Sequence, residues 1–272
     1  AVNNISHVGH CHPKVIEAAN NQNKELNTNT RYLHDSIIDY AQNLTRTLPD
    51  GLEVCYFTNS GSESNDLALR IARLYNDSYE SIVLSGAYHG HTSSLIDISP
   101  YKFLGPGGKG KPDFVHLIPM PDMYRGEHKT ADAKPEEYYI DLVNKTITKI
   151  EKKGKRLAFF IVEPIMGCGG QIIVPPSFMT EAFKIVKEAG GLCIVDEVQI
   201  GFGRVGSHFW GFEMSNVEPD IITLGKSIGN GHPLSVTITR KDIADIFNNG
   251  MEYFNSFGGN PVSCAVGQAV LD

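Results

Sequence analysis

Two charged residues each follow a short apolar run, and together they could do chemistry that neither does alone. Lys226 comes after Ile221–Leu224 and a glycine, and Asp196 comes directly after Leu192–Val195. A lysine can form a Schiff base with the aldehyde of pyridoxal phosphate (PLP), and a carboxylate can hold the pyridinium nitrogen of that cofactor protonated. Either residue alone is typical of a solvated strand end, so the prediction of a PLP site depends on further residues.

A glycine- and serine-containing segment is the candidate for holding the cofactor phosphate. Asn59–Asn65 joins a predicted strand to a predicted helix and contains Gly61 and Ser62. Backbone N–H groups, a hydroxyl and the helix dipole attract an anion at such a helix N-terminus. The simpler interpretation is a helix capped by serine, and this segment taken alone favours it.

An aromatic residue stands after another predicted strand. Ala87–His91 contains Tyr88, whose ring could stack on a heteroaromatic ring or simply cover the core. His89 and His91, and the cluster at 7–12, raise the question of a metal. No carboxylate or cysteine lies at a familiar metal-ligand spacing, so we expect no metal site.

Two glycine-rich segments resemble nucleotide-binding motifs without meeting their requirements. Gly201–Gly206 fits GxGxxG, but Ser207–Phe212 shows no helical period and Asp196 with its acidic neighbour would repel a pyrophosphate. Gly105–Lys111 fits GxxxxGK, but Pro112 stands where a serine or threonine should bind Mg²⁺. We therefore predict neither a dinucleotide site nor a P-loop.

The composition is that of an ordinary globular protein. The 272 residues are 41% hydrophobic and 20% charged, with a net charge of −7. No basic cluster suggests nucleic acid, and no apolar run approaches the about 18 residues that span a membrane. The 5 cysteines are scattered with no CxxC pair, which indicates free thiols in a reducing compartment.

Short apolar runs alternate with helical patterns along the chain. Strands are predicted at Glu53–Thr58, Ser81–Leu84, Phe114–Ile118, Leu157–Val162, Leu192–Val195, Ile221–Leu224 and Leu234–Thr239. Helices are predicted at Pro13–Leu26, Asp35–Leu48 (capped by Asp35 or Ser36), after Asn59–Glu63, at Glu136–Lys153 and Ser177–Ala189, and from Pro261 onward. Gly105–Pro112 and Glu127–Pro135 are expected to be irregular. The pattern predicts an α/β fold, a mainly parallel sheet with helices on both faces.

The motifs in this order resemble the class-III (fold type I) family of PLP-dependent aminotransferases along essentially the whole chain. They are Gly9–Pro13, Asn59–Asn65, Tyr88–Gly90, Glu163–Ile165, Asp196–Gln199, Gly201–Arg204, Gly225–Lys226 and Ser256–Pro261. The resemblance implies the end of an N-terminal segment at residues 1–30 and the PLP-binding large domain at 31–272. We expect the chain to be a piece of a longer protein whose C-terminal small domain is missing.

The resemblance also implies roles for residues around the cofactor ring. Lys226 would be the Schiff-base lysine and proton shuttle, and Asp196 would pair with the pyridine nitrogen. Gln199 would contact the ring hydroxyl and Tyr88 would stack on the ring, with His89 also among the cofactor-binding residues.

Further implied roles concern the cofactor phosphate and a second subunit. Gly61 and Ser62 would hold the phosphate, and Glu163 would support the segment from Asp196 to Gln199. Ser256 stands where the family usually has a threonine that contacts the phosphate from the neighbouring subunit. A homodimer or tetramer with shared active sites is therefore expected.

A sharper resemblance is to the alanine–glyoxylate aminotransferase 2-like phospho-lyases, which act on 5-phosphohydroxy-L-lysine or phosphoethanolamine. It depends on Leu26–Asp35, Ser99–Phe103, Gly225–Pro233 and Met251–Asn255. Cys168 supports it, because many ω-aminotransferases of the class carry there a glutamate that pairs with an arginine, the residue that otherwise grips the second substrate's carboxylate. Without that glutamate, amine exchange with 2-oxoglutarate is disfavoured.

The leading hypothesis is thus elimination of phosphate and ammonia from a small phosphorylated amine. The alternatives are a true transaminase that moves an amine to a keto acid such as glyoxylate or pyruvate, and an inactive fragment or partner-binding remnant. Arg31, Lys102 and Arg125 are guesses for the ligands of the substrate phosphate. The branch implies the mitochondrial matrix, with the cytoplasm as the alternative.

Overall fold

The computed structural model describes residues 2–272, and its centre is a seven-stranded sheet in the order β1-β9-β8-β7-β4-β2-β3. The strands are β1 (Leu52–Thr58), β2 (Glu80–Leu84), β3 (Val115–Ile118), β4 (Leu157–Val162), β7 (Leu192–Asp196), β8 (Ile221–Leu224) and β9 (Ser235–Arg240). A separate hairpin pairs β5 (Ile165–Met166) with β6 (Ile172–Ile173). The mainly parallel sheet predicted from the sequence is confirmed.

One strand departs from the expected parallel pattern. β9 runs antiparallel to both of its neighbours, β8 and β1. Only residues 225–234 connect β8 to β9. A parallel pair needs a crossover of about a dozen residues or more, usually with a helix, and this shorter connection therefore returns the chain antiparallel.

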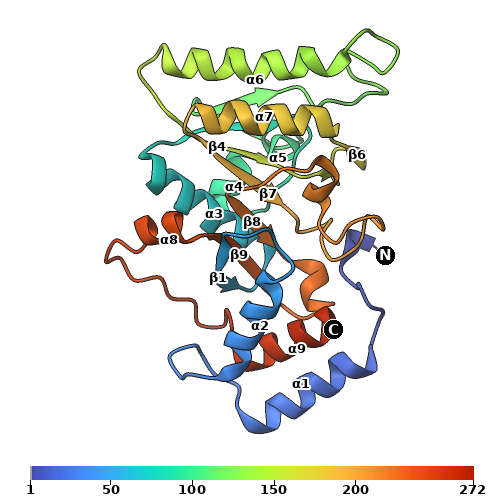
Figure 1. Cartoon of the computed structure of the whole chain (residues 1–272), viewed down its shortest axis with the longest axis vertical. Helices are drawn as coiled ribbons and strands as arrows, with labels where there is room; N and C mark the ends of the chain where they lie inside the picture. The colour runs from blue at the N-terminus through green and yellow to red at the C-terminus, as the bar shows by residue number, and fades with distance from the viewer. Residues whose placement is uncertain (1) are drawn as a thin grey trace.

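Helices cover the sheet on both faces (Figure 1). They are α1 (Pro13–Glu25), α2 (Asp35–Thr45), α3 (Gly61–Asn76), α4 (Ser93–Asp97), α5 (Pro100–Phe103), α6 (Pro135–Glu151), α7 (Pro176–Glu188), α8 (Lys241–Phe247) and α9 (Pro261–Leu271), with 3-10 helices η1 (Val2–Asn4), η2 (Gly211–Ser215) and η3 (Lys226–Gly229). Figure 1 places α6 and α7 at one end of the molecule and α1, α2 and α9 at the other.

The buried side chains form two clusters separated by the sheet. Phe160 and Val195 belong to the cluster that contains residues of α6 and α7, whereas Phe159 and Ile194 belong to the cluster that contains residues of α3. Successive side chains of a strand point to opposite faces, so a strand covered on both faces is apolar throughout. This is why β4 and β7 appear in the sequence as continuous apolar runs.

Several local predictions were wrong in detail. The cap of α2 is His34, whose Nδ1 accepts from the Ser36 N–H at 3.1 Å, and not Asp35 or Ser36. Histidine is not a favoured cap residue, so composition gave no signal for it. The elements α4, α5, β5 and β6 are too short to produce a periodic pattern. The irregular conformation expected for Gly105–Pro112 is confirmed.

Two further observations concern possible environments and ligands. Within residues 2–272, no helix has the length and apolar character needed to cross a bilayer. Among the same residues, no three histidine, cysteine, aspartate or glutamate side chains are grouped so that they could hold a metal ion.

Candidate active site

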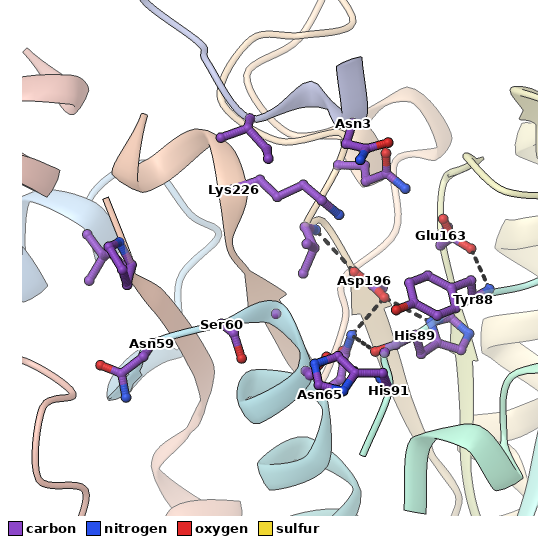
Figure 2. Close-up of a pocket in the computed structure, with 18 of the residues that line it drawn as sticks. Asn3, Asn59, Ser60, Asn65, Tyr88, His89, His91, Glu163, Asp196 and Lys226 are labelled. Atoms are coloured by element: carbon purple, nitrogen blue, oxygen red, sulfur yellow. Dashed lines mark hydrogen bonds and ion pairs between the residues drawn. The ribbon is translucent and has the colours of Figure 1, made fainter. Parts of the chain in front are cut away.

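Lys226 and Asp196 line one cavity of about 500 Å³ at the carboxyl edge of the parallel strands. Asp196 is the last residue of β7, and Lys226 begins η3 just beyond the end of the neighbouring strand β8. Figure 2 shows the Lys226 side chain extending through the pocket in the direction of Asp196. The carboxyl edge is where open α/β sheets bind their ligands, so this cavity is the candidate active site.

The Asp196 carboxylate is buried and held by hydrogen bonds on both oxygens. Oδ2 accepts from Asn65 Nδ2 at 2.8 Å and from His89 Nδ1 at 2.9 Å, while Oδ1 accepts from the Val198 N–H at 3.1 Å. Each carboxylate oxygen accepts about two hydrogen bonds, so Oδ2 is filled and Oδ1 can accept one more. That capacity fits a pyridinium N–H.

Lys226 has a backbone conformation that is unusual for a residue with a side chain. Its φ is 40°, in the left-handed region, where residues other than glycine are uncommon. Such conformations persist when the surrounding structure imposes them, and they concentrate at functional sites. Here the turn after β8 directs the lysine into the pocket rather than along the strand.

The N-terminus of α3 has the features of an anion site. Ser60 caps the helix through its Oγ, which accepts from the Glu63 N–H at 3.2 Å. Ser62 Oγ accepts from the His91 N–H at 3.2 Å, and its own O–H remains free to donate. Among residues 2–272, no hydrogen bond uses the N–H groups of Gly61 and Ser62. The segment is therefore both a capped helix and a cradle with donors available for a phosphate.

At two positions beside this cradle only a glycine fits, because there is no room for a side chain. A Cβ on Gly61 would lie 2.8 Å from Val198 Cγ1, and a Cβ on Gly90 would lie 2.7 Å from Ser62 Oγ. Gly90 also has a φ of 142°, which side chains rarely allow. A side chain at either position would displace residues that line the cavity.

Tyr88 and Glu163 form the opposite wall. The Tyr88 N–H donates to Glu163 Oε1 at 3.2 Å, and the Gly167 N–H donates to Glu163 Oε2 at 3.1 Å. Burial raises the pKa of Glu163 to about 7. Glu163 thus joins the aromatic residue to the β5–β6 turn, which carries Cys168. Within the described chain, Glu163 makes no hydrogen bond to Asp196 or to Gln199, but Gly167 lies close to the Gln199 carboxamide, since a Cβ there would be 2.5 Å from Nε2.

Gln199 also lines the cavity, at the point where the N-terminal segment crosses it. Its Oε1 accepts from Asn4 Nδ2 at 3.4 Å. Arg204 donates to the Asn4 carbonyl at 3.2 Å and to Ser227 Oγ at 3.1 Å. These contacts fasten residues near the start of the chain beside the lysine, an arrangement that sequence patterns did not indicate.

Ser256 is the one predicted cofactor residue that does not line the cavity, and the three candidate ligands of the substrate phosphate, Arg31, Lys102 and Arg125, do not line it either. Ser256 is exposed, beside Asn255. The Asn255 carboxamide accepts from Asn59 Nδ2 at 3.0 Å and donates to Glu63 Oε2 at 2.9 Å. The serine therefore lies on the surface close to the cradle, and within this chain it stays outside the pocket.

Asn65 is a site residue to which sequence analysis gave no role. Its Nδ2 donates to Asp196 Oδ2 and to the His89 carbonyl, each at 2.8 Å, and its Oδ1 accepts from Thr223 Oγ1 at 2.6 Å. The signal was present, because a buried asparagine within an apolar helix face must satisfy its amide. Its partners, however, lie on distant segments and could not be inferred.

With this geometry established, comparison with known proteins assigns the class. The chain belongs to the aminotransferase class-III family, whose model matches residues 3–272. This confirms the predicted fold type I architecture and membership in a family of PLP-dependent enzymes. The unfilled acceptor of Asp196, the free N–H groups of the cradle and the lysine in one pocket fit that cofactor.

Individual relatives narrow the comparison. A Drosophila melanogaster protein named alanine–glyoxylate aminotransferase 2-like is 48% identical over 99% of this chain and 56% of its own length. Ethanolamine-phosphate phospho-lyase homolog 1 of Caenorhabditis elegans is 41% identical over 99% of this chain and 60% of its own. Human mitochondrial alanine–glyoxylate aminotransferase 2 is 40% identical over 97% of this chain and 55% of its own length.

Among solved structures, a phospholyase from Arthrobacter in complex with phosphoethanolamine superposes with a TM-score of 0.90. It is 37% identical, and the match covers 99% of this chain and 63% of that one. The chain thus spans little more than half the length of the relatives that it matches.

Proposed function

We propose that this protein is a PLP-dependent phospho-lyase that eliminates phosphate and ammonia from a phosphorylated amine such as 5-phosphohydroxy-L-lysine or phosphoethanolamine. The net reaction consumes one water and yields an aldehyde, ammonia and phosphate. The observation that carries the proposal is a single pocket that contains Lys226, a pre-oriented Asp196 and an anion cradle, with Cys168 on its wall. The names of the worm and Arthrobacter proteins support it.

The positions of these residues in the pocket support a separate task for each of them. When bound, PLP withdraws electrons from the amine-bearing carbon of the substrate. Asp196 Oδ1 would accept the ring N–H, and the N–H groups of Gly61 and Ser62 would hold the cofactor phosphate. Lys226 Nζ removes the proton from the amine-bearing carbon, and the Tyr88 ring forms the wall beside it.

Transamination is the second candidate function, because it shares the proton removal and differs only in the later steps. The name of the human relative favours it. Cys168 argues against it, since the position lacks the carboxylate that many ω-aminotransferases have there. Incubation of the holoenzyme with each phosphoamine, with and without a keto acid, separates the two. Phosphate release that needs no keto acid supports the lyase, whereas amine transfer that requires glyoxylate or pyruvate supports the transaminase.

Lys226→Ala is the direct test of the catalytic assignment. We expect phosphate release to fall by at least about 10³-fold, because the variant lacks the group that moves the proton. PLP should still bind through the cradle and Asp196, which absorbance spectra of the purified protein will show. Lys24→Ala, on the exposed surface of α1, is the control and should retain full activity. A purified wild-type protein with no cofactor absorbance would instead support the inactive-remnant hypothesis.

The proposal also includes the oligomeric state of the protein and its location in the cell. A homodimer with shared active sites, in which Ser256 of one subunit meets the cofactor phosphate of the other, accounts for the exposed position of this serine beside the cradle. A tetramer would preserve the same contact. The mitochondrial matrix is the proposed location, with the cytoplasm as the alternative, and the name of the human relative supports the former.

A further inference from the structure

The proposed lyase must recognise the phosphate of its substrate at a definite wall of the pocket. In both candidate substrates the phosphate is on the carbon next to the amine-bearing carbon. The group that binds it must therefore reach the part of the cavity that contains Lys226. Arg31, Lys102 and Arg125 are the basic residues to compare, and the inference drawn from them rests on the proposed function.

The two arginines are already engaged with carboxylates. Arg31 forms a salt bridge of 2.7 Å with Glu252 and lies 4.6 Å from the ring centroid of Phe254. Arg125 Nε lies 3.3 Å from Asp122 Oδ2. A guanidinium already paired with a carboxylate must give up that pairing before it can bind a phosphate with its full charge.

Lys102, unlike the two arginines, is not paired with a carboxylate, and it lies close to a residue of the pocket. Its Nζ lies 5.5 Å from the ring centroid of Tyr88, which lines the pocket, and 5.6 Å from that of Tyr101. No described carboxylate comes within the 4.0 Å that defines a salt bridge with this ammonium. Lys102 is itself exposed and lines a second cavity rather than the one that contains Asp196. Its cation–π contact with Tyr88 brings the ammonium to the edge of the active site without neutralising it.

Cys168 adds no negative charge to the adjoining wall. Burial raises the pKa of its thiol and the Glu163 carboxylate raises it further, whereas Lys226 and Lys102 both lower it. The net upward shift keeps the thiol neutral at physiological pH. The side chain therefore lies among two ammonium groups, Lys226 and Lys102, and two carboxylates, Glu163 and Asp196, without carrying a charge of its own. A glutamate at this position would add a third carboxylate and oppose the binding of a phosphate.

We propose that Lys102 binds the phosphate of the phosphoamine substrate, on a pocket wall that Cys168 leaves uncharged so that it admits this dianion. Lys102 would then favour phosphorylated amines over their unphosphorylated forms. The same ammonium would stabilise the phosphate as it departs, because the leaving group keeps its negative charge.

The test uses the holoenzyme, in which PLP fills the cradle, so that added inorganic phosphate reports on the substrate site. Lys102→Gln should raise the KM for phosphoethanolamine or phosphohydroxylysine and the inhibition constant of inorganic phosphate about 10- to 100-fold. Cys168→Glu should do the same by adding a negative charge to the wall. Lys102→Arg should keep most of the affinity. Cofactor absorbance should be unchanged in all three variants.

Lys109→Gln is the matched control, because this exposed lysine lines the same second cavity as Lys102. It should leave both constants at their wild-type values. The inference is wrong if Lys102→Gln behaves like this control, or if Arg125→Gln causes the loss instead. A wild-type holoenzyme that releases no phosphate would contradict the proposed reaction. The dissociation constant of inorganic phosphate, measured by direct binding to the holoenzyme without turnover, would still decide the role of Lys102.

Discussion

At the scale of single residues, the site depends most on Asn65, which no catalytic motif singles out. Its carboxamide is bound on both sides, to Asp196 and to Thr223. It therefore links α3, which carries the phosphate cradle, to β7 and β8, which end at the acid and the lysine. Because a buried amide with all its partners has one orientation, it fixes the distance between cradle and acid.

Asn65→Asp should disrupt this arrangement more than any truncation. The substitution removes the Asn65 N–H that donates to Asp196 Oδ2. In its place a carboxylate oxygen would face Asp196, either as a like charge or as an acceptor without a donor. We expect PLP affinity to fall by about tenfold or more and phosphate release with it, as measured by cofactor titration followed by absorbance. Thr223→Val removes only the hydroxyl partner of Asn65 and should have a smaller effect. Equal effects of the two variants would contradict the assigned role.

At the scale of elements, one buried carboxylate connects the end of β7 to η2. Glu197 Oε2 accepts from the Gly211 N–H at 3.0 Å and Oε1 accepts from the Phe212 N–H at 2.8 Å. These are N–H groups at the start of η2, which have no partner within the helix. Burial raises the pKa of Glu197 to about 7, from an ordinary value of 4.5.

This shift predicts a pH dependence of stability with a definite sign. Between pH 4.5 and about 7 the folded state holds a proton on Glu197 that the unfolded state has lost, so the free energy of unfolding falls as pH rises through this window. The loss should be about 1–3 kcal/mol and should level off above pH 7. Urea unfolding of the wild type and of Glu197→Gln, at pH 5 and pH 8, isolates it. A stability difference between the two proteins that is the same at both pH values would refute the prediction.

The elements also show what sequence can predict and where it stops. β4, β7 and β8 and the residues at their ends follow from local apolar runs, so local sequence was enough to propose Lys226 and Asp196. The direction of β9 depends on a connection length whose consequence is clear only once its partner strand is known. The hairpin that carries Cys168 has strands of two residues each, too short for any periodic signal.

The site residues, too, divide into those that a local sequence pattern predicts and those that depend on distant parts of the chain. Gly61, Ser62 and Tyr88 stand in short motifs beside strand ends, where a local pattern indicates a ligand. The contact between Asn4 and Gln199 joins residues 195 positions apart, and no local pattern predicts such a pair. Ser256 was proposed only through a family resemblance, because nothing in its surroundings indicates a ligand.

At the scale of the whole molecule, the surface around Ser256 exposes large apolar side chains. Leu33 is 94% exposed, Phe257 is 70% exposed and Tyr32 is 65% exposed. Their two segments lie side by side, since Arg31 pairs with Glu252. Apolar side chains gathered on one surface mark interaction sites more often than scattered ones do. This is the surface that the proposed homodimer would bury.

If the active sites are shared between subunits, two inactive variants should recover activity when they form a mixed dimer, which a monomer could not do. Lys226→Ala inactivates the site that uses its own lysine, and Ser256→Asp should inactivate the partner's site by repelling the cofactor phosphate. In a mixed dimer of the two variants both defects fall in one site, and the other site is intact. Random pairing of equal amounts makes half of the dimers mixed, so the co-expressed variants should recover about a quarter of wild-type phosphate release.

Purified separately, each of these variants should be inactive. A co-expressed mixture that stays inactive would place Ser256 at the site of its own subunit, because both sites of a mixed dimer would then carry one defect. A fully active Ser256→Asp protein would remove the serine from the cofactor phosphate altogether. The complementation therefore decides between a site built from one chain and a site completed by its partner, since only the second arrangement separates the two defects from an intact site.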